Sequence, residues 1–294
     1  MPVADYLAPT VNVPSSVGRF KKYTEKHRFH IPNALRGVGG RATELSFTAE
    51  DGTFNCVPHA LDFPVDKLEQ LEEAQSENML QEAAQMCSEI GALCHEKEVV
   101  DLALATHAAD GAPNWGAGAT LDPITDTGTG GINIGIRTVL LATGYGSGAQ
   151  IRLLWGPQAW SYFCNNASIR DHFASVVVTG GVPNTVPTQQ NIQNLFLVPV
   201  QSMISTMVYD SAVEGLAKTN AFVMDADLLI FATSPSPTRR DPSFMKTFRL
   251  AGNWMVPGYY TRDDGRVEVA KFDWSSDVQV TNTTACYRIT PTFT

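Results

Sequence analysis

The feature that most constrains the fold is a long proline-free stretch that carries the pattern of one helix. After Pro64 the next proline is Pro113. Pro64 and Asp66 suit a helix start, and Gly111 with Pro113 suits a helix stop. Between them apolar side chains recur at steps of three and four residues, on one stripe of an α-helix; they include Leu68, Leu71, Met79, Ala83, Met86, Cys87, Ile90, Leu93 and Cys94. The sequence predicts a helix over 74–105, starting near residue 65 at its longest.

A helix of this length does not fit easily inside a globule. Residues 74–105 would form a helix about 48 Å long at ~1.5 Å per residue. A compact sphere made from a chain of this length would have a diameter of roughly 50 Å. Because the helix is as long as such a sphere is wide, the sequence favours a flattened, elongated body.

The segments before the helix are predicted to extend away from any core of their own. Residues 1–20 contain prolines and a glycine but no sustained helix or strand period, which indicates an extended arm that frays or lies along a neighbour. Alternating segments at 43–47 and 53–57 then flank a turn signal at 49–52, and 37–40 is glycine-rich, flexible backbone. Since an isolated hairpin is marginal in water, we expect this one to pack on something else, such as another chain.

The part that follows the helix mixes both kinds of secondary structure, which predicts the α+β class. A hairpin is expected to turn at Asp263-Asp264-Gly265, and residues 234–242 form a proline-rich loop. The other expected elements are helices at 132–143, 158–173 and 188–195, and strands at 150–155, 196–200, 227–232 and 284–290.

Charge is scarce along the chain. Only 17% of residues are charged, against roughly 25% in ordinary soluble proteins, so we expect much of the surface to be subunit contact. The net charge of −9 argues against a nucleic-acid reader, which carries a clustered basic face. There is no apolar run of the ~18 residues that a membrane helix needs, and the first residues lack a signal-peptide pattern. Five scattered cysteines indicate a reduced, cytosolic chain.

Two residue groups resemble parts of cofactor or metal sites. The glycine-rich segment 144–149 fits a relaxed dinucleotide-binding pattern, but a predicted helix precedes it and a strand follows. That order is the reverse of what pyrophosphate binding requires, so a helix C-cap is the better interpretation. Cys87, Cys94 and His95 lack the paired short spacings of a zinc site. We therefore predict no cofactor-binding and no metal-binding residues.

One further group concerns nucleophilic catalysis. Cys164 lies near Asp171 and His172, which are the residue types that a thiol nucleophile needs. No family signature surrounds them, and an apolar helix with a charged end explains them better. We predict no catalytic residue and no enzyme; a cytosolic enzyme that uses Cys164 or the glycine loop stays open as an alternative from a different class.

The order of segments along the whole chain resembles the major capsid proteins of tailed bacteriophages, which share the Hong Kong-97-like fold. The long helix resembles the spine helix of that family. The other matching segments are 4–9 in the arm, 44–61 at the end of the extended E-loop, 151–160 with 165–171 at the entry to the axial domain, 190–210 in the axial core, and the final strand at 284–289.

The resemblance implies an α+β Hong Kong-97-like fold with a definite division of the chain. It assigns an N-terminal arm to 1–25, an E-loop to 26–63, a peripheral domain with the spine helix to 64–140 and 275–294, and an axial domain to 141–274. Some relatives crosslink E-loop lysines to asparagines of a neighbour. No lysine lies between Arg36 and Glu50, so that chemistry is not carried over.

The resemblance also implies a function. The chain would be a major head protein that self-assembles through hexamers and pentamers into the icosahedral shell of a virion. This shell is built in the host cytoplasm, with portal, scaffolding and decoration proteins as further partners, and without cofactors or a membrane. It would enclose double-stranded DNA without sequence-specific binding, and an acidic inner wall would leave that DNA mobile. An encapsulin-type nanocompartment shell is the alternative of the same fold.

Overall fold

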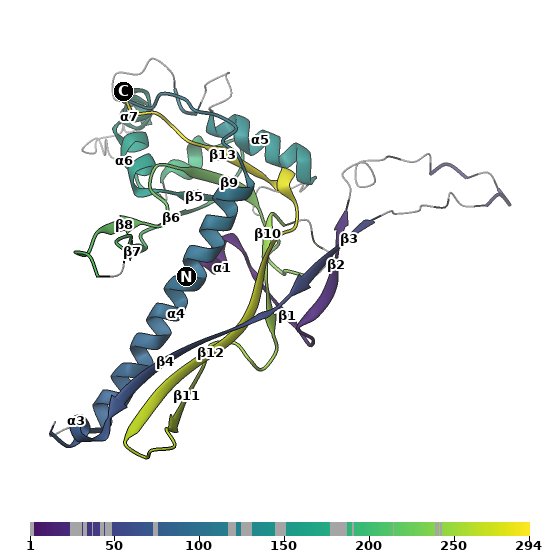
Figure 1. Cartoon of the computed structure of the whole chain (residues 1–294). Coiled ribbons are helices and arrows are strands. Elements are labelled where there is room, and N and C mark those ends of the chain that lie inside the picture. Colours follow the sequence, from purple (N-terminus) through teal and green to yellow (C-terminus); the bar gives the residue numbers. More distant parts are fainter. Residues whose placement is uncertain are drawn as a thin grey trace.

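The long helix is present as α4 (Ser76–Thr106), which has 31 residues and therefore a length of about 46 Å. This confirms the helix predicted over 74–105. It does not extend back to residue 65, because the chain forms a strand up to Asp66 and then the separate short helix α3 (Lys67–Glu72). Figure 1 shows α4 running from one end of an elongated molecule into the body at the other end.

The computed structural model describes residues 3–23, 31, 34–36, 38–41, 44, 49–72, 76–116, 122–124, 131–144, 151–176, 187–189, 191–213, 215–238, 241 and 243–294. Within these residues no helix is both long and apolar enough to cross a membrane. The other elements, in chain order, are α1 (Val3–Leu7), β1 (Thr10–Val13), β2 (Val17–Tyr23), β3 (Ala49–Asn55), β4 (Val57–Asp66), α5 (Ile132–Thr143), β5 (Ile151–Trp155), α6 (Pro157–Asn165), α7 (Ala167–Val176), the 3₁₀-helix η2 (Asn191–Leu195), β6 (Gln201–Ile204), β7 (Val208–Asp210), β8 (Asn220–Phe222), β9 (Leu228–Ala232), β10 (Met245–Leu250), β11 (Val256–Thr261), β12 (Val267–Val280), the 3₁₀-helix η3 (Thr283–Ala285) and β13 (Cys286–Ile289).

Helix α4 packs along strand β12, and the contacts between them repeat in step. Ala83 clusters with Ala270, and Cys87 clusters with Phe272. Four helix residues rise about 6 Å and two strand residues about 6.6 Å, so every fourth residue of α4 meets every second residue of β12. Gly91 belongs to the same stripe, and a Cβ atom there would lie 2.7 Å from the Phe272 ring. The glycine that weakens the helix locally is thus the residue that lets it approach the sheet.

The larger sheet has the strand order β1-β10-β12-β11, and β4 pairs with β12 on its other side. The hairpin between β11 and β12 turns at Gly265, which has φ +68°, as predicted. Residues 245–274 were assigned to the axial domain, but they form strands of this sheet beside α4. The reason is that their partners, β4 and β1, lie about 200 residues away in the sequence, where no local pattern reveals the pairing.

The smaller sheet has the order β13-β9-β5-β6 and sits with α5, α6 and α7 at the upper end of Figure 1. Helix α5 packs closely on it, because a Cβ atom on Gly135 would lie 2.6 Å from Ile230 and 2.7 Å from the Tyr287 ring. Both α5 and β13 were assigned to the peripheral domain, yet both belong to this layer, with β13 paired antiparallel to β9. The C-terminal strand therefore does not return to the larger sheet.

The N-terminal arm is folded onto its own chain, which corrects the expectation that it frays or lies along a neighbour. Val3, Tyr6 and Leu7 lie on one face of α1 and are buried in the main core. Strand β1 pairs in parallel with β10, with Thr10 opposite Thr247. Spacings of three and four residues give even this short helix an apolar face, and burial of that face holds the arm in place.

The excursion before α4 is a hairpin, but not with the turn expected at 49–52. Those residues lie within β3, which pairs antiparallel with β2, placing Gly18 opposite Phe54 and Phe20 opposite Gly52. The hairpin therefore begins in the segment assigned to the arm. The strand expected at 43–47 lies mostly outside the described residues, as does Gly37. The ring of each phenylalanine covers the glycine across from it and leaves no room for a Cβ atom there, so this register depends on both glycines.

Several smaller boundaries also differ from the expectation. The helix predicted over 158–173 is two helices, α6 and α7, separated at Asn166, whose backbone is extended with ψ 132°. The helix expected at 188–195 is only the 3₁₀-helix η2, and the strand expected at 196–200 begins later, as β6. Pro199 lacks an amide hydrogen for a sheet ladder, which explains the late start. The strands expected at 150–155, 227–232 and 284–290 are confirmed as β5, β9 and β13.

Candidate assembly surfaces

One buried carboxylate fastens the N-terminal helix to the long helix. Glu96 of α4 is 2% exposed, and the amides of Val3 and Ala4 donate hydrogen bonds to its side chain. The first amides of a helix have no partner within the helix, so Glu96 satisfies two donors that would otherwise be orphaned. Burial raises the pKa of Glu96, and the two amide bonds oppose that rise.

Tyr6 fastens the other side of α1 to the smaller sheet. Its hydroxyl donates to the carbonyl oxygens of Leu153 at 3.2 Å and Gln201 at 2.7 Å, and its ring meets Phe231 edge-on at 5.8 Å. The Arg152 guanidinium lies 4.9 Å from the ring centre and donates to the Tyr6 carbonyl at 2.8 Å. Helix α1 thereby connects α4 to the smaller sheet.

Replacing Glu96 with alanine is expected to cost about 1–2 kcal/mol, because two buried amides at a helix N-terminus lose their acceptor. Urea unfolding measures the loss, and limited proteolysis shows whether residues 3–8 come loose. The control is Glu96→Gln, which keeps a carbonyl acceptor and removes the charge.

The pH dependence of stability gives a second test. Because the native pKa of Glu96 is raised, the stability linked to its protonation is present below its unfolded pKa and is lost as pH rises through the native pKa. Wild-type stability should therefore fall relative to Glu96→Gln over that window, and equal pH profiles would contradict the assignment.

A network around Arg288 joins the end of α4 to the smaller sheet. Arg288 of β13 forms a two-pronged ion pair with Asp227, Nε to Oδ1 at 3.0 Å and a terminal nitrogen to Oδ2 at 3.2 Å. Its other terminal nitrogen donates to the carbonyl oxygens of Leu104 at 2.8 Å and His107 at 3.1 Å. A cation at a helix C-terminus satisfies free carbonyls and complements the helix dipole. We call Arg288, Asp227 and the carbonyl groups of Leu104 and His107 the α4 joint.

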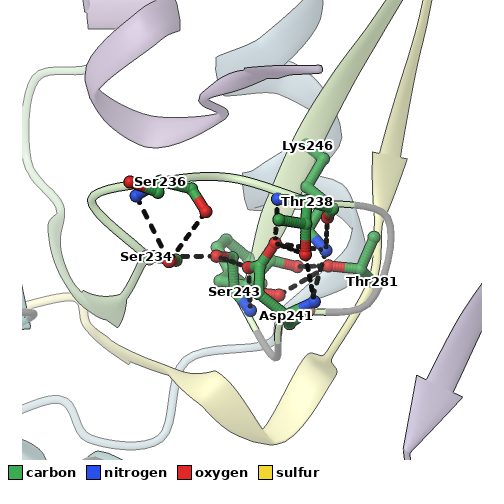
Figure 2. Close-up of polar contacts among 8 residues, drawn as sticks. Ser234, Ser236, Thr238, Asp241, Ser243, Lys246 and Thr281 are labelled. Atoms are coloured by element: carbon green, nitrogen blue, oxygen red, sulfur yellow. Dashed lines mark hydrogen bonds and ion pairs between the residues drawn. The ribbon is translucent and has the colours of Figure 1, made fainter. Parts of the chain in front are cut away.

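A second buried network closes the proline-rich loop after β9 (Figure 2). The Lys246 side chain is fully buried, and its Nζ donates at 2.7 Å to the carbonyl oxygens of both Thr238 and Asp241 and lies 3.0 Å from an Asp241 carboxylate oxygen. The same carboxylate accepts hydrogen bonds from the amides of Thr238 at 2.6 Å and Ser243 at 3.1 Å and from the Ser243 hydroxyl. Burial lowers the pKa of Lys246, and Asp241 opposes this shift.

The base of the β2–β3 hairpin is anchored by three stacked rings. Phe54 stacks on Phe248 of β10 at 4.6 Å between ring centres, and Phe20 stacks on the same ring at 5.3 Å. Val11, Val13 and Cys56 complete this small core. These rings hold the base of the hairpin, and Figure 1 shows β2 and β3 leading away from α4 and the larger sheet.

Exposed large apolar side chains occur in four regions of the described fold. Single exposed apolar residues are ordinary, but groups of them mark interaction sites. The groups are Val17, Ile31, Leu35 and Val38 on and beyond β2; Val57, Phe63, Leu68, Met86, Ile90, Val256, Tyr259 and Tyr260 around α4 and the larger sheet; Val208, Val213, Leu216 and Phe222 on β7, β8 and their loop; and Leu141 with Leu197 beside α5.

The structure does not bring the candidate zinc ligands Cys87, Cys94 and His95 together into a site. Cys87 is buried in a cluster with Phe272, whereas Cys94 on the same helix is exposed. His95 is buried with its ring edge-on to Trp254 at 5.2 Å. Among the described residues, no three His, Cys, Asp or Glu side chains are grouped so as to hold a metal ion. Gly144 ends α5 in a left-handed conformation with φ 62°, which confirms the C-cap, while 145–149 lie outside the described residues.

Cys164 has the environment of a packed thiol. Burial raises its pKa to about 11, against a smaller opposing effect of Arg170, and its sulfur lies 3.9 Å from the Pro187 carbonyl oxygen. A thiol with a raised pKa stays protonated near neutral pH, whereas a nucleophilic cysteine needs the thiolate. Asp171 is exposed, and the side chain of His172 is outside the described residues.

The residues that hold the described parts together were not found by sequence reasoning. Arg288 and Asp227 are 61 positions apart, and no local spacing connects them. Glu96 lies 93 positions from Val3, within a helix where an acidic residue looks like part of a solvated face. The sequence held a weak signal for the Asp241–Lys246 pair. Lys246 alternates with Phe244 and Phe248 on one face of a strand, and a lysine buried on an apolar face needs a partner.

Comparisons with known proteins agree with this architecture. No protein-family model matches the chain, and no curated protein matches it. Among solved structures, it is similar to a phage-related protein from Bordetella bronchiseptica RB50, with a TM-score of 0.70 and 19% identity over 98% of this chain and 90% of the other. It is also similar to the capsid of the cyanophage P-SCSP1u, with a TM-score of 0.57 and 10% identity over 97% of this chain and 86% of the other.

The same fold occurs in a protein nanocompartment. An encapsulin complex from Synechococcus elongatus PCC 7942 matches with a TM-score of 0.55 and 10% identity, covering 98% of this chain and 86% of the other. At these identities the similarity concerns the fold. All three matches extend over nearly the whole chain, with the arm, the hairpin and the long helix included. The chain therefore has the Hong Kong-97-like fold of phage major capsid proteins.

Proposed function

We propose that this chain is the major capsid protein of a tailed bacteriophage, which assembles through hexamers and pentamers into an icosahedral shell around double-stranded DNA. The observation that carries the proposal is the similarity of the whole chain, at a TM-score of 0.70, to a phage-related protein. An elongated body with groups of exposed apolar residues suits a subunit that gains much of its stability from contacts with its neighbours.

Within this proposal the parts of the molecule take the roles of capsid domains. The peripheral domain is α4 with the larger sheet, and the axial domain is the smaller sheet with α5, α6 and α7. The β2–β3 hairpin is the E-loop, and the stack of Phe20 and Phe54 on Phe248 anchors its base to the subunit. The net charge of −9 suits a container whose wall repels DNA. Portal, scaffolding and decoration proteins would be further partners, in a virion built in the host cytoplasm.

The encapsulin-like shell is the second candidate, since an encapsulin complex shares the fold at a TM-score of 0.55. It differs from the phage head in cargo, which is protein rather than a genome. The protonated state of Cys164 near neutral pH disfavours the third candidate, an enzyme that uses this thiol.

Electron microscopy of the purified chain tests the proposal. Closed shells, hexamers or pentamers are expected after expression alone or with the neighbouring genes. Nuclease-protected DNA of genome length inside shells from virus-producing cells would support the phage head, and a packaged protein would support the nanocompartment. A chain that stays monomeric across concentration, salt and pH would overturn both shell proposals.

A further inference from the structure

The β7–β8 hairpin stands apart from both large sheets. Its two strands pair only with each other among the described strands, and Figure 1 shows it protruding from one side of the upper body, with α5 on the opposite side. The loop between the strands carries Val213, which is 73% exposed, and Leu216, which is 72% exposed. The hairpin thus holds apolar side chains away from the body.

The loop of this hairpin is internally braced. One Asp210 carboxylate oxygen accepts hydrogen bonds from the amides of Ala212 at 3.0 Å and Thr219 at 2.9 Å, and the Ser211 amide donates to the Thr219 carbonyl at 2.8 Å. The two amide bonds lower the pKa of Asp210, so it stays ionised. A loop that is ordered before binding loses less conformational entropy on docking, which suits a preformed contact element.

The opposite side of the body carries a surface of matching character. The buried side of α5 includes Ile136 and Val139, and its outer side presents Arg137 and Leu141, one turn apart and both exposed. Leu197, 58% exposed, is held next to this helix because its amide donates to the Asn133 side chain at 2.9 Å. Two leucines therefore flank a guanidinium on the outward face of α5.

We propose that the β7–β8 hairpin of one copy docks on the outer face of α5 of the next copy. Val213 and Leu216 would cover Leu141 and Leu197, and the ionised Asp210 would lie toward Arg137. The two surfaces are complementary in apolar character, and they lie on opposite sides of one chain. Asp210 and Arg137 carry opposite charges, and Lys218 in the hairpin loop offsets part of this attraction. Such a contact is heterologous and repeats from copy to copy until the ring closes. The inference rests on the proposed shell function and identifies one of its contacts.

Disulfide trapping tests the pairing directly. The double variant Leu216→Cys with Leu141→Cys, oxidised during assembly, should give a ladder of covalent oligomers that ends at the ring size. Native Cys94 is exposed and can form disulfides of its own. Wild type and both single variants therefore measure the background of covalent oligomers. The matched control is Leu216→Cys with Leu68→Cys, because Leu68 is equally exposed at 70% but lies on α3, at the far end of α4. A ladder in the control and not in the test pair would overturn the assignment to α5.

A charge placed in the contact tests its energetic role. Leu216→Asp should raise the protein concentration needed for half-maximal assembly at least about tenfold, because each subunit contributes one such contact to a ring and that contact loses about one decade of affinity. Leu216→Met should assemble like wild type. The melting temperature of unassembled Leu216→Asp should match that of wild type, since the side chain is exposed. If wild type forms shells and Leu216→Asp assembles equally well, the proposed contact is wrong but the proposed shell function stands. Failure of wild type to assemble at all would instead overturn the proposed function.

Discussion

Replacing Arg288 with alanine is expected to destabilise the protein by about 3–5 kcal/mol, the usual cost of removing one partner from a buried ion pair, because this pair is largely, though not fully, shielded from water. The Arg288 and Asp227 side chains are 18% and 13% exposed. Without the guanidinium, the main neighbour left to the Asp227 carboxylate is the Thr290 hydroxyl at 2.5 Å. The carbonyls of Leu104 and His107 lose their donor at the same time.

Urea unfolding at neutral pH measures this loss, and hydrogen exchange locates it. Exchange should rise at the C-terminal turn of α4 and along β13, because Arg288 connects them. The control is Arg288→Lys, which keeps the charge but cannot form the two-pronged pair, and it should show an intermediate loss. A cost below about 1 kcal/mol for alanine, the range of exposed pairs, would show that the α4 joint is not a structural connection.

The position of the α4 joint explains why the loss of Arg288 is expected to be so destabilising. The apolar contacts of α4 with β12 hold the helix along its length, whereas Arg288 holds its end against the smaller sheet. Helix α1 provides the second connection, through Glu96 on α4 and Tyr6 on the smaller sheet. A subunit of a closed shell needs fixed angles between its parts, and both connections consist of directional polar bonds.

The elements predicted correctly are those that a local pattern determines. Helix α4, which has 31 residues, was predicted because apolar side chains recur at steps of three and four from Met79 to Cys94. Strand β9 was predicted because five consecutive apolar residues form it. The arm was missed because α1 has only five residues, too few for a reliable helical period. Its burial depends on Glu96 and on the smaller sheet, which are distant in the sequence.

The errors in the hairpin turn and in the expected strand partners have one physical cause. Residues 49–52 have the composition of a turn, but β3 pairs with β2, some thirty residues upstream, and the stack of Phe20 and Phe54 on Phe248 sets that pairing. The register of a strand pair depends on which face is buried. Here the side chain that covers this face, Phe248, comes from β10. In the same way β13 pairs with β9 rather than with the sheet beside α4.

Replacing Asp241 with alanine is the second change expected to cost about 3–5 kcal/mol, because it leaves the charge of the fully buried Lys246 without its carboxylate. The amides of Thr238 and Ser243 also lose their acceptor. In Lys246→Met the charge itself is gone, and Asp241 keeps these amide donors. That variant should lose only about 1–3 kcal/mol, the cost of two carbonyls left without a donor.

The double variant Asp241→Ala with Lys246→Met separates the ion pair from simple packing. If the penalty of Asp241→Ala comes from an uncompensated buried charge, the double variant must be more stable than Asp241→Ala alone. If Asp241 acts only by filling space or bracing the loop, the second substitution must lower the free energy of unfolding further. Urea unfolding of the four proteins at one pH decides between these outcomes.

The pH dependence gives the same comparison an independent readout. Burial lowers the native pKa of Lys246, and Asp241 raises it again. Without Asp241 the native pKa falls further, so the unfolded chain binds the proton more tightly over a wider pH range. In that range stability rises with pH, and the deficit of Asp241→Ala relative to wild type should shrink between neutral pH and the unfolded pKa of lysine, about 10.4. In Lys246→Met and the double variant this slope is absent, because the group that titrates has been removed.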